Sequence, residues 1–128
     1  MTKLKVHRLG DLQLRIMKVL WARREASVAD VHAALGGPAA FAYTTIATML
    51  RKMEARGLVN HRAEGRSFMY RPRVDEQHVS RGMADHLVDR VFEGSLANAV
   101  SHLLTTREVS RAELRELERL IAEKKKKL

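Results

Sequence analysis

The sequence predicts a mainly α-helical fold with one small β-hairpin, followed by a region that is helical throughout. Three observations support this class. Apolar residues recur at helical spacing along most of the 128-residue chain. Turn residues isolate one short stretch with strand-like alternation, and after Pro72 only helical patterns follow. With 45% hydrophobic and 30% charged residues, the chain has enough apolar side chains to build a core.

Two helices are predicted before the middle of the chain. The first covers residues 9–24, with Asp11 expected as its N-cap. It is apolar over most of its surface, so we expect it at the centre of its domain. Ser27 and Asp30 have the spacing of a capping box, which predicts a short second helix that residues 36–38 stop. The inner residues of this second helix are expected to be Val28, Val31 and Leu35.

A third helix is predicted over residues 44–56, with Gly57 as a left-handed C-cap. One face carries apolar side chains at positions i, i+3, i+4 and i+7, which predicts a buried stripe of Ile46, Met49, Leu50 and Met53. The centre of the opposite face has hydroxyls and cations and no acid, namely Thr44, Thr48 and Arg51, flanked by Lys52. Such a face suits base edges and phosphates in the major groove of DNA. An ordinary solvated helix is the alternative.

A β-hairpin is predicted directly after this helix. Its strands are residues 58–62 and 67–71, joined through residues 63–66, and Pro72 ends the second strand. The alternation of Phe68 and Tyr70 predicts one buried face. Three helices followed by a basic hairpin is the order of a winged helix-turn-helix. We therefore expect residues 1–73 to form a winged-helix DNA-binding domain.

Helices alone are predicted beyond Pro72, over residues 75–92 and 96–104 and again after a second capping box at Ser110 and Glu113. Their apolar stripes are too broad for about 50 residues to bury alone. We expect residues 74–128 to be a dimerisation region in a two-fold homodimer. A monomer with these helices folded back is the alternative. The expected interface residues are Val79, Met83, Leu87, Val91, Leu96, Val100, Leu103, Leu114, Leu117 and Ile121.

The charge is divided unevenly between these two parts. Residues 1–73 hold 14 Lys or Arg against 5 Asp or Glu, whereas residues 74–128 hold 10 of each, so the first part carries the whole net charge of +9. A basic half beside a neutral one is expected when one half meets a polyanion and the other meets protein. The chain has no cysteine, no apolar run typical of a signal peptide and no candidate membrane span, so we expect a cytoplasmic protein without membrane insertion.

Several segments together resemble a known family. They are residues 9–12, Leu20-Trp21 at the end of the first helix, Thr44-Thr45-Ile46, residues 53–59 and residues 110–117. Over nearly the whole chain the sequence resembles the penicillinase repressors of the BlaI/MecI/CopY type. The resemblance implies a cytoplasmic homodimeric repressor that binds a pseudo-palindromic DNA operator. It also implies relief by an inducing protease that cuts the C-terminal region. The Asn-Phe bond cut in staphylococcal members is His102-Leu103 here, and the Cys-x-Cys motifs of the copper-responsive branch are missing.

The candidate DNA-binding residues follow from the expected docking of the third helix. Its first turn points into the groove, so the base-reading candidates are Tyr43, Thr44, Thr45 and Thr48. Arg51 and Lys52 should reach phosphates, or for Arg51 a guanine. Arg62 and Arg66 flank the hairpin tip and are expected to contact the DNA backbone or minor groove as a wing. Ser67 is expected to donate a hydrogen bond to a phosphate.

Other functions are less favoured. The chain has no Gly-x-Ser-x-Gly elbow and no glycine-rich phosphate loop, so we expect neither an enzyme nor a bound cofactor. Asp85, His86 and Asp89 share a helix, but no second histidine follows His86 at i+4, and no metal site is predicted. Two alternatives remain: a winged-helix module that docks an acidic protein partner, and a ligand-sensing regulator of the MarR kind, which the short C-terminal part disfavours.

Overall fold

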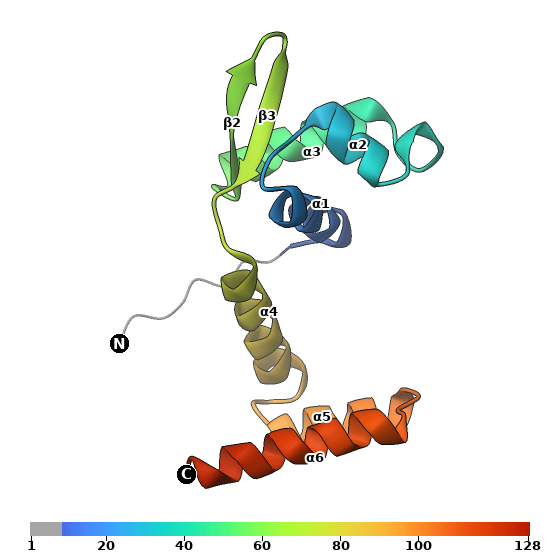
Figure 1. The fold of residues 1–128 in the computed structure, drawn as a ribbon, viewed down its shortest axis with the longest axis vertical. Helices are drawn as coiled ribbons and strands as arrows, with labels where there is room; N and C mark the ends of the chain where they lie inside the picture. The colour runs from blue at the N-terminus through green and yellow to red at the C-terminus, as the bar shows by residue number, and fades with distance from the viewer. Residues whose placement is uncertain (1–8) are drawn as a thin grey trace. The chain divides into compact units, whose positions relative to one another are not determined.

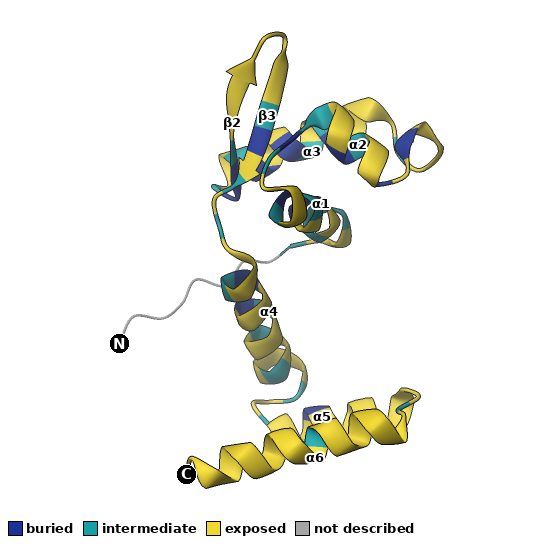
Figure 2. Ribbon diagram, viewed as in Figure 1, coloured by how far each residue is buried: buried dark blue, intermediate teal, exposed yellow. Residues whose placement is uncertain are grey.

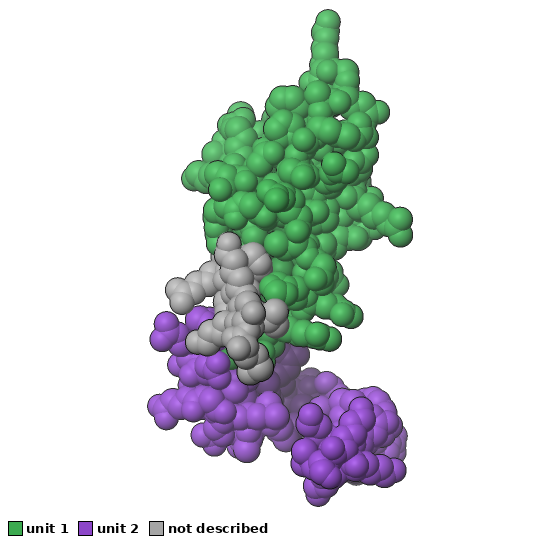
Figure 3. Space-filling view, turned by 90° about the vertical axis from the view of Figure 1, so that its left-hand side faces the viewer, with its two compact units in different colours: residues 1–85 green, residues 86–128 purple. Residues whose placement is uncertain are grey.

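The computed structural model describes residues 9–128, and it divides into two compact units, residues 1–85 and 86–128 (Figure 3). The fold class is confirmed: helices dominate, and the first unit contains one small antiparallel sheet (Figure 1). The elements in chain order are α1 (Asp11–Arg23), β1 (Ala26–Ser27), α2 (Val28–Ala34), η1 (Gly37–Ala39), α3 (Tyr43–Ala55), β2 (Val59–Glu64), β3 (Ser67–Pro72), α4 (Glu76–Val91), α5 (Leu96–Thr106) and α6 (Arg111–Lys126).

The core of the first unit lies where α1, α2 and α3 meet the base of the sheet (Figure 2). The apolar stripe predicted for α3 is confirmed, because Ile46, Leu50 and Met53 are fully buried and Met49 packs against the core at its edge. α1 contributes three fully buried side chains, which confirms its central position. The other buried residues include Val31 of α2, Leu58, and Val59 and Tyr70 of the hairpin.

The ends of the helices test the local predictions. The capping box of α2 is confirmed: the Oγ of Ser27 accepts from the backbone N–H of Asp30 at 3.1 Å, and a carboxylate oxygen of Asp30 accepts from the N–H of Ser27 at 3.1 Å. Gly57 has a φ of 78°, as a left-handed C-cap requires. The N-cap predicted for α1 is wrong by one residue. Gly10 is the N-cap and Asp11 is the first helical residue, where its charge still faces the positive end of the helix.

The sheet has the strand order β1-β3-β2 and is antiparallel throughout. The two-residue strand β1 was not predicted, because two residues are too few to display alternation. The predicted loop was too long: Ala63 and Glu64 belong to β2, and Gly65 and Arg66 form the turn. The prediction of one buried face holds for Tyr70, which is 3% exposed, and is wrong for Phe68, which is 50% exposed. The hairpin extends past the core (Figure 1), and residues 61–68 are exposed.

The second unit holds the end of α4 with α5 and α6. Ser95 and Ser110 cap α5 and α6, each accepting from a backbone N–H three residues later at 3.1 Å. Ala99 is the buried residue of α5, and α6 has none (Figure 2). Leu114 and Ile121, predicted as interface residues, are 38% and 56% exposed in the single chain. Within residues 9–128, the helices are too short or too polar to cross a bilayer.

Candidate nucleic-acid interface

Helix α3 presents the polar face that the sequence predicted. Its apolar stripe is fixed in the core, and this leaves Thr44, Thr45, Thr48, Arg51 and Lys52 exposed. A guanidinium N–H of Arg51 donates to the hydroxyl oxygen of Thr48 at 3.2 Å. This contact holds the two side chains together in the second turn of the helix, where both can donate hydrogen bonds. The first turn contains no acidic residue that would repel a phosphate.

A histidine outside the helix supports its first turn. The Tyr43 ring is half exposed and meets the ring of His32 edge-on, with 5.7 Å between centroids. The Nε2 of His32 lies 2.7 Å from the carbonyl oxygen of Phe41, so that ring nitrogen donates the hydrogen bond. His32 thereby ties α2 to the loop that leads into α3. The sequence did not single out this residue, because nothing in its spacing connects it to the loop nine residues later.

We call the β2–β3 hairpin the wing. A groove of about 270 Å³ lies between α3, the wing and the residues 27–29 at the start of α2. The wing contributes Arg66, Ser67 and the half-exposed ring of Phe68 to its lining, and α3 contributes Tyr43, Ala47 and Arg51. Four of the predicted residues, Tyr43, Arg51, Arg66 and Ser67, therefore line one concave surface. Phe68, which was predicted to lie on the buried face of the hairpin, also lines this groove. Two guanidinium groups beside a hydroxyl and aromatic rings offer both charge and apolar contact to a sugar-phosphate chain.

The inner face of the wing is joined to α3 by His61. The Nδ1 of His61 donates to the carboxylate of Glu54, lying 2.8 Å from both of its oxygens. The imidazole also stacks on the rings of Phe68 and Tyr70, with centroid distances of 4.3 and 5.4 Å. The one acid in α3 is thus directed toward the wing. Neither Glu54 nor His61 was a predicted site residue.

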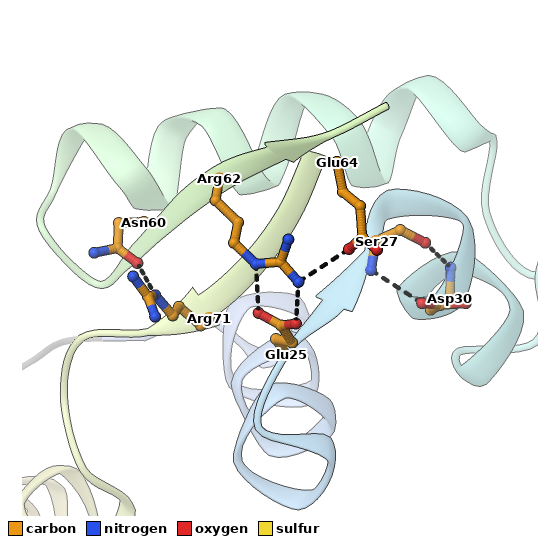
Figure 4. Close-up of polar contacts among 7 residues, drawn as sticks. All are labelled: Glu25, Ser27, Asp30, Asn60, Arg62, Glu64 and Arg71. Carbon is orange, nitrogen blue, oxygen red and sulfur yellow. Dashed lines mark hydrogen bonds and ion pairs between the residues drawn. The ribbon is translucent and has the colours of Figure 1, made fainter. Parts of the chain in front are cut away.

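The predicted wing residue Arg62 lies elsewhere. It is not among the residues that line the groove, and its guanidinium contacts two acids (Figure 4). Its Nη2 lies 2.6 Å from Glu25 and 2.9 Å from Glu64, and its Nε donates to Glu25 at 3.3 Å. The hydrogen bond from Arg62 holds the pKa of the Glu25 carboxyl below its ordinary value, despite some opposing desolvation. The same bond raises the pKa of Arg62.

The residues predicted for a dimer interface fall into two groups. Val79 is 1% exposed, so its side chain is already covered within the chain. Most of the others expose apolar surface: Leu87, Val91, Leu96, Val100, Leu103, Leu114 and Ile121 are between 37% and 67% exposed, while Met83 and Leu117 are half-buried. Val100, Leu103 and Leu117 line a shallow cavity of about 220 Å³ between α5 and α6. Among residues 9–128, no group of three or more metal-ligating side chains could hold an ion.

Comparison with known proteins identifies the family of the chain. The family model of the penicillinase repressor matches residues 9–123. The penicillinase repressor of Bacillus licheniformis is 30% identical over 121 residues, which cover 94% of each chain. The transcriptional regulator BlaI of Mycobacterium tuberculosis is 34% identical over 102 residues, covering 78% of this chain and 74% of that one.

A solved structure is similar to part of the chain. The solution structure of the DNA-binding domain of the repressor BlaI has a TM-score of 0.51 and 34% sequence identity, and the match covers 58% of this chain and 90% of that one. These relatives are repressors, and DNA binding is the function that the polar face of α3 and the basic groove beside it suit. The chain therefore belongs to the penicillinase repressor family and is a transcriptional repressor of the BlaI type, not an enzyme.

Proposed function

We propose that this chain acts in the bacterial cytoplasm as a homodimer and binds a pseudo-palindromic operator through α3 and the wing. The observation that supports this most strongly is the groove lined by Tyr43 and Arg51 of α3 and by Arg66 and Ser67 of the wing, with Thr48 hydrogen-bonded to Arg51 beside it. A helix of this kind enters the major groove with its first turn toward the bases. The threonine hydroxyls can donate or accept and their methyls can contact thymine, whereas the cations contact phosphates.

A binding titration with promoter-containing genomic fragments tests this proposal. We expect the full chain to bind at least one fragment far more tightly than random duplex at about 0.15 M salt, since specific sites exceed non-specific ones by roughly 10³-fold or more. Fluorescence anisotropy or gel retardation measures it. Equal and weak binding to every fragment would contradict the proposal and favour a module that docks an acidic protein instead.

We further propose that residues 1–73 bind DNA and residues 74–128 hold two copies together. α5 and α6 bury so little in a single chain that they have a small folding free energy of their own. Their exposed leucines and isoleucine form the kind of apolar surface that marks a protein interface. A second copy placed on a two-fold axis would cover the same residues on both chains.

The oligomeric state in solution tests this part. We expect light scattering after size exclusion to give the mass of two chains for the wild type and of one chain for Ile121→Glu. The matched control is Ala112→Glu, which adds the same charge on the opposite side of α6. A wild-type monomer, or a dimer that tolerates Ile121→Glu, would contradict the assigned interface.

Relief by proteolysis in the C-terminal region is the last part of the proposal, and it rests on family membership. The His102–Leu103 bond lies within α5, and Leu103 is 44% exposed. Cutting there would separate α6 from the rest of the chain and remove four of the ten proposed interface residues. Intact-mass measurement on protein from host cells treated with a β-lactam tests this. A fragment ending at His102 is expected, whereas full-length protein in derepressed cells would contradict cleavage.

A further inference from the structure

We infer that Arg62 is a positioning residue that braces the wing, and that it does not contact DNA. This inference rests on the proposed DNA-binding function. It begins with the register of the hairpin. His61 pairs with Tyr70 and Arg62 pairs with Met69. Since neighbouring residues of a strand point to opposite faces, His61 lies on the face that meets α3, and Arg62 lies on the other face.

The contacts of Arg62 cross the whole sheet. Its strand β2 is separated from β1 by β3, and Glu25 immediately precedes β1. The side chain of Arg62 therefore reaches past the middle strand to form its two hydrogen bonds with Glu25 (Figure 4). A two-point contact of this kind fixes direction as well as distance. It links the outer strand of the wing to the segment between α1 and β1.

The wing is joined to the rest of the first unit mainly at its base, where Val59 and Tyr70 are buried in the core. Beyond the base, β1 pairs with β3 through two residues, Ala26 and Ser27. On the inner face, His61 reaches Glu54 of α3, as described above. Arg62 and His61 thus hold β2 from opposite faces, one toward β1 and the other toward α3. Arg66, Ser67 and Phe68 lie at or beyond the turn, so their position in the groove depends on how firmly β2 is held.

The charge around Arg62 argues against a phosphate contact. Glu25 and Glu64 together carry two negative charges within 3 Å of one guanidinium. A phosphate approaching Arg62 would have to displace a carboxylate and would be repelled by both. If Arg62 moved from a carboxylate to a phosphate, the freed carboxylate would stay beside the DNA and the local net charge would not change. Such an exchange would release few condensed counterions from the DNA. Arg62 should therefore add little to the salt dependence of DNA binding, unlike Arg66.

The test uses the full chain with Arg62→Met, Glu25→Gln and the double variant, and Arg66→Met as the matched control. DNA affinity is measured against salt concentration, and hydrogen exchange is measured at the amides of β2 and β3. Arg62→Met and Glu25→Gln should both speed exchange in the wing and weaken binding by a similar factor, and Arg62→Met should leave the slope of log K against log salt unchanged. The double variant should be no weaker than either single one, since both remove the same interaction. Arg66→Met should lower the slope by about 0.9 for each lost contact and leave exchange unaltered.

Two results would overturn the inference. One is a slope for Arg62→Met that falls as far as that of Arg66→Met, and the other is unchanged wing exchange in both Arg62→Met and Glu25→Gln. If the wild type itself binds no DNA selectively, the proposed function fails. Hydrogen exchange then still decides whether Arg62 braces the wing.

Discussion

Replacing Arg66 by alanine tests the wing through the salt dependence of DNA binding. α3 and the wing carry three exposed cations, Arg51, Lys52 and Arg66, and Arg51 and Arg66 line the groove between these two elements. With Arg62 paired to acids, a dimer would make about six phosphate contacts, for a slope of about −5.4 in log K against log salt. Arg66→Ala removes one contact from each subunit, which leaves about four contacts and a slope of about −3.6.

These slopes give a measurable difference. Between about 50 and 200 mM salt, the wild type should lose about three orders of magnitude in affinity and Arg66→Ala about two. The affinity ratio between the two proteins should therefore shrink about tenfold as salt rises over this range. Anisotropy titrations at four or five salt concentrations measure both lines. The control is Arg115→Ala, which removes an equal charge from α6 and should keep the wild-type slope. An unchanged slope for Arg66→Ala would refute the assignment of Arg66 to the DNA backbone.

Three further predictions concern α3 and its support. Thr48→Val keeps the shape and removes the hydroxyl, so it should change the preferred operator bases, by up to about tenfold in discrimination, in a selection from random duplexes; an unchanged consensus would contradict base reading by this hydroxyl. Leu50→Ala should lower the free energy of unfolding by about 2–5 kcal/mol in urea titrations, because the side chain is fully buried; a loss below about 1 kcal/mol would contradict its place in the core. The N–H of Ser27 lowers the pKa of Asp30 below its ordinary 3.8 in the folded chain. The ionised carboxylate of Asp30 therefore stabilises the folded chain above pH 3.8, and this stabilisation disappears as the pH falls through the lowered pKa of the folded state. The difference in unfolding free energy between wild type and Asp30→Asn should accordingly close in acid. A difference that does not change with pH would contradict the assigned cause.

Local patterns in the sequence were sufficient where a short spacing determines the structure. The Ser27–Asp30 capping box and the positive φ of Gly57 depend on neighbours within a few residues, and both are confirmed. The buried stripe of α3 follows from helical periodicity alone. The N-cap of α1 was misplaced because Gly10 and Asp11 are both acceptable caps, and only the backbone geometry distinguishes them.

What the sequence could not supply depends on contacts between distant segments. Alternation correctly put Phe68 and Tyr70 on one side of the hairpin, but it could not tell where along the strand the core ends. β1 exists only because it pairs with β3, more than 40 residues later. Arg62 was predicted to contact DNA because it is a cation near the hairpin tip. Its ion pair with Glu25 could not be predicted, because Glu25 lies 37 residues away in the chain. Neither propensity nor spacing connects such residues.

Selection of binding sites from a pool of random duplexes tests the central claim most directly. If two copies of α3 and its wing dock on one duplex about a two-fold axis, the full chain should enrich a pseudo-palindrome. Its half-sites should lie about one helical turn apart or a multiple of it, and the selected duplex should bind two chains. Enrichment of a single unsymmetrical half-site bound by one chain would contradict the dimer, and failure to enrich any sequence would contradict DNA recognition itself.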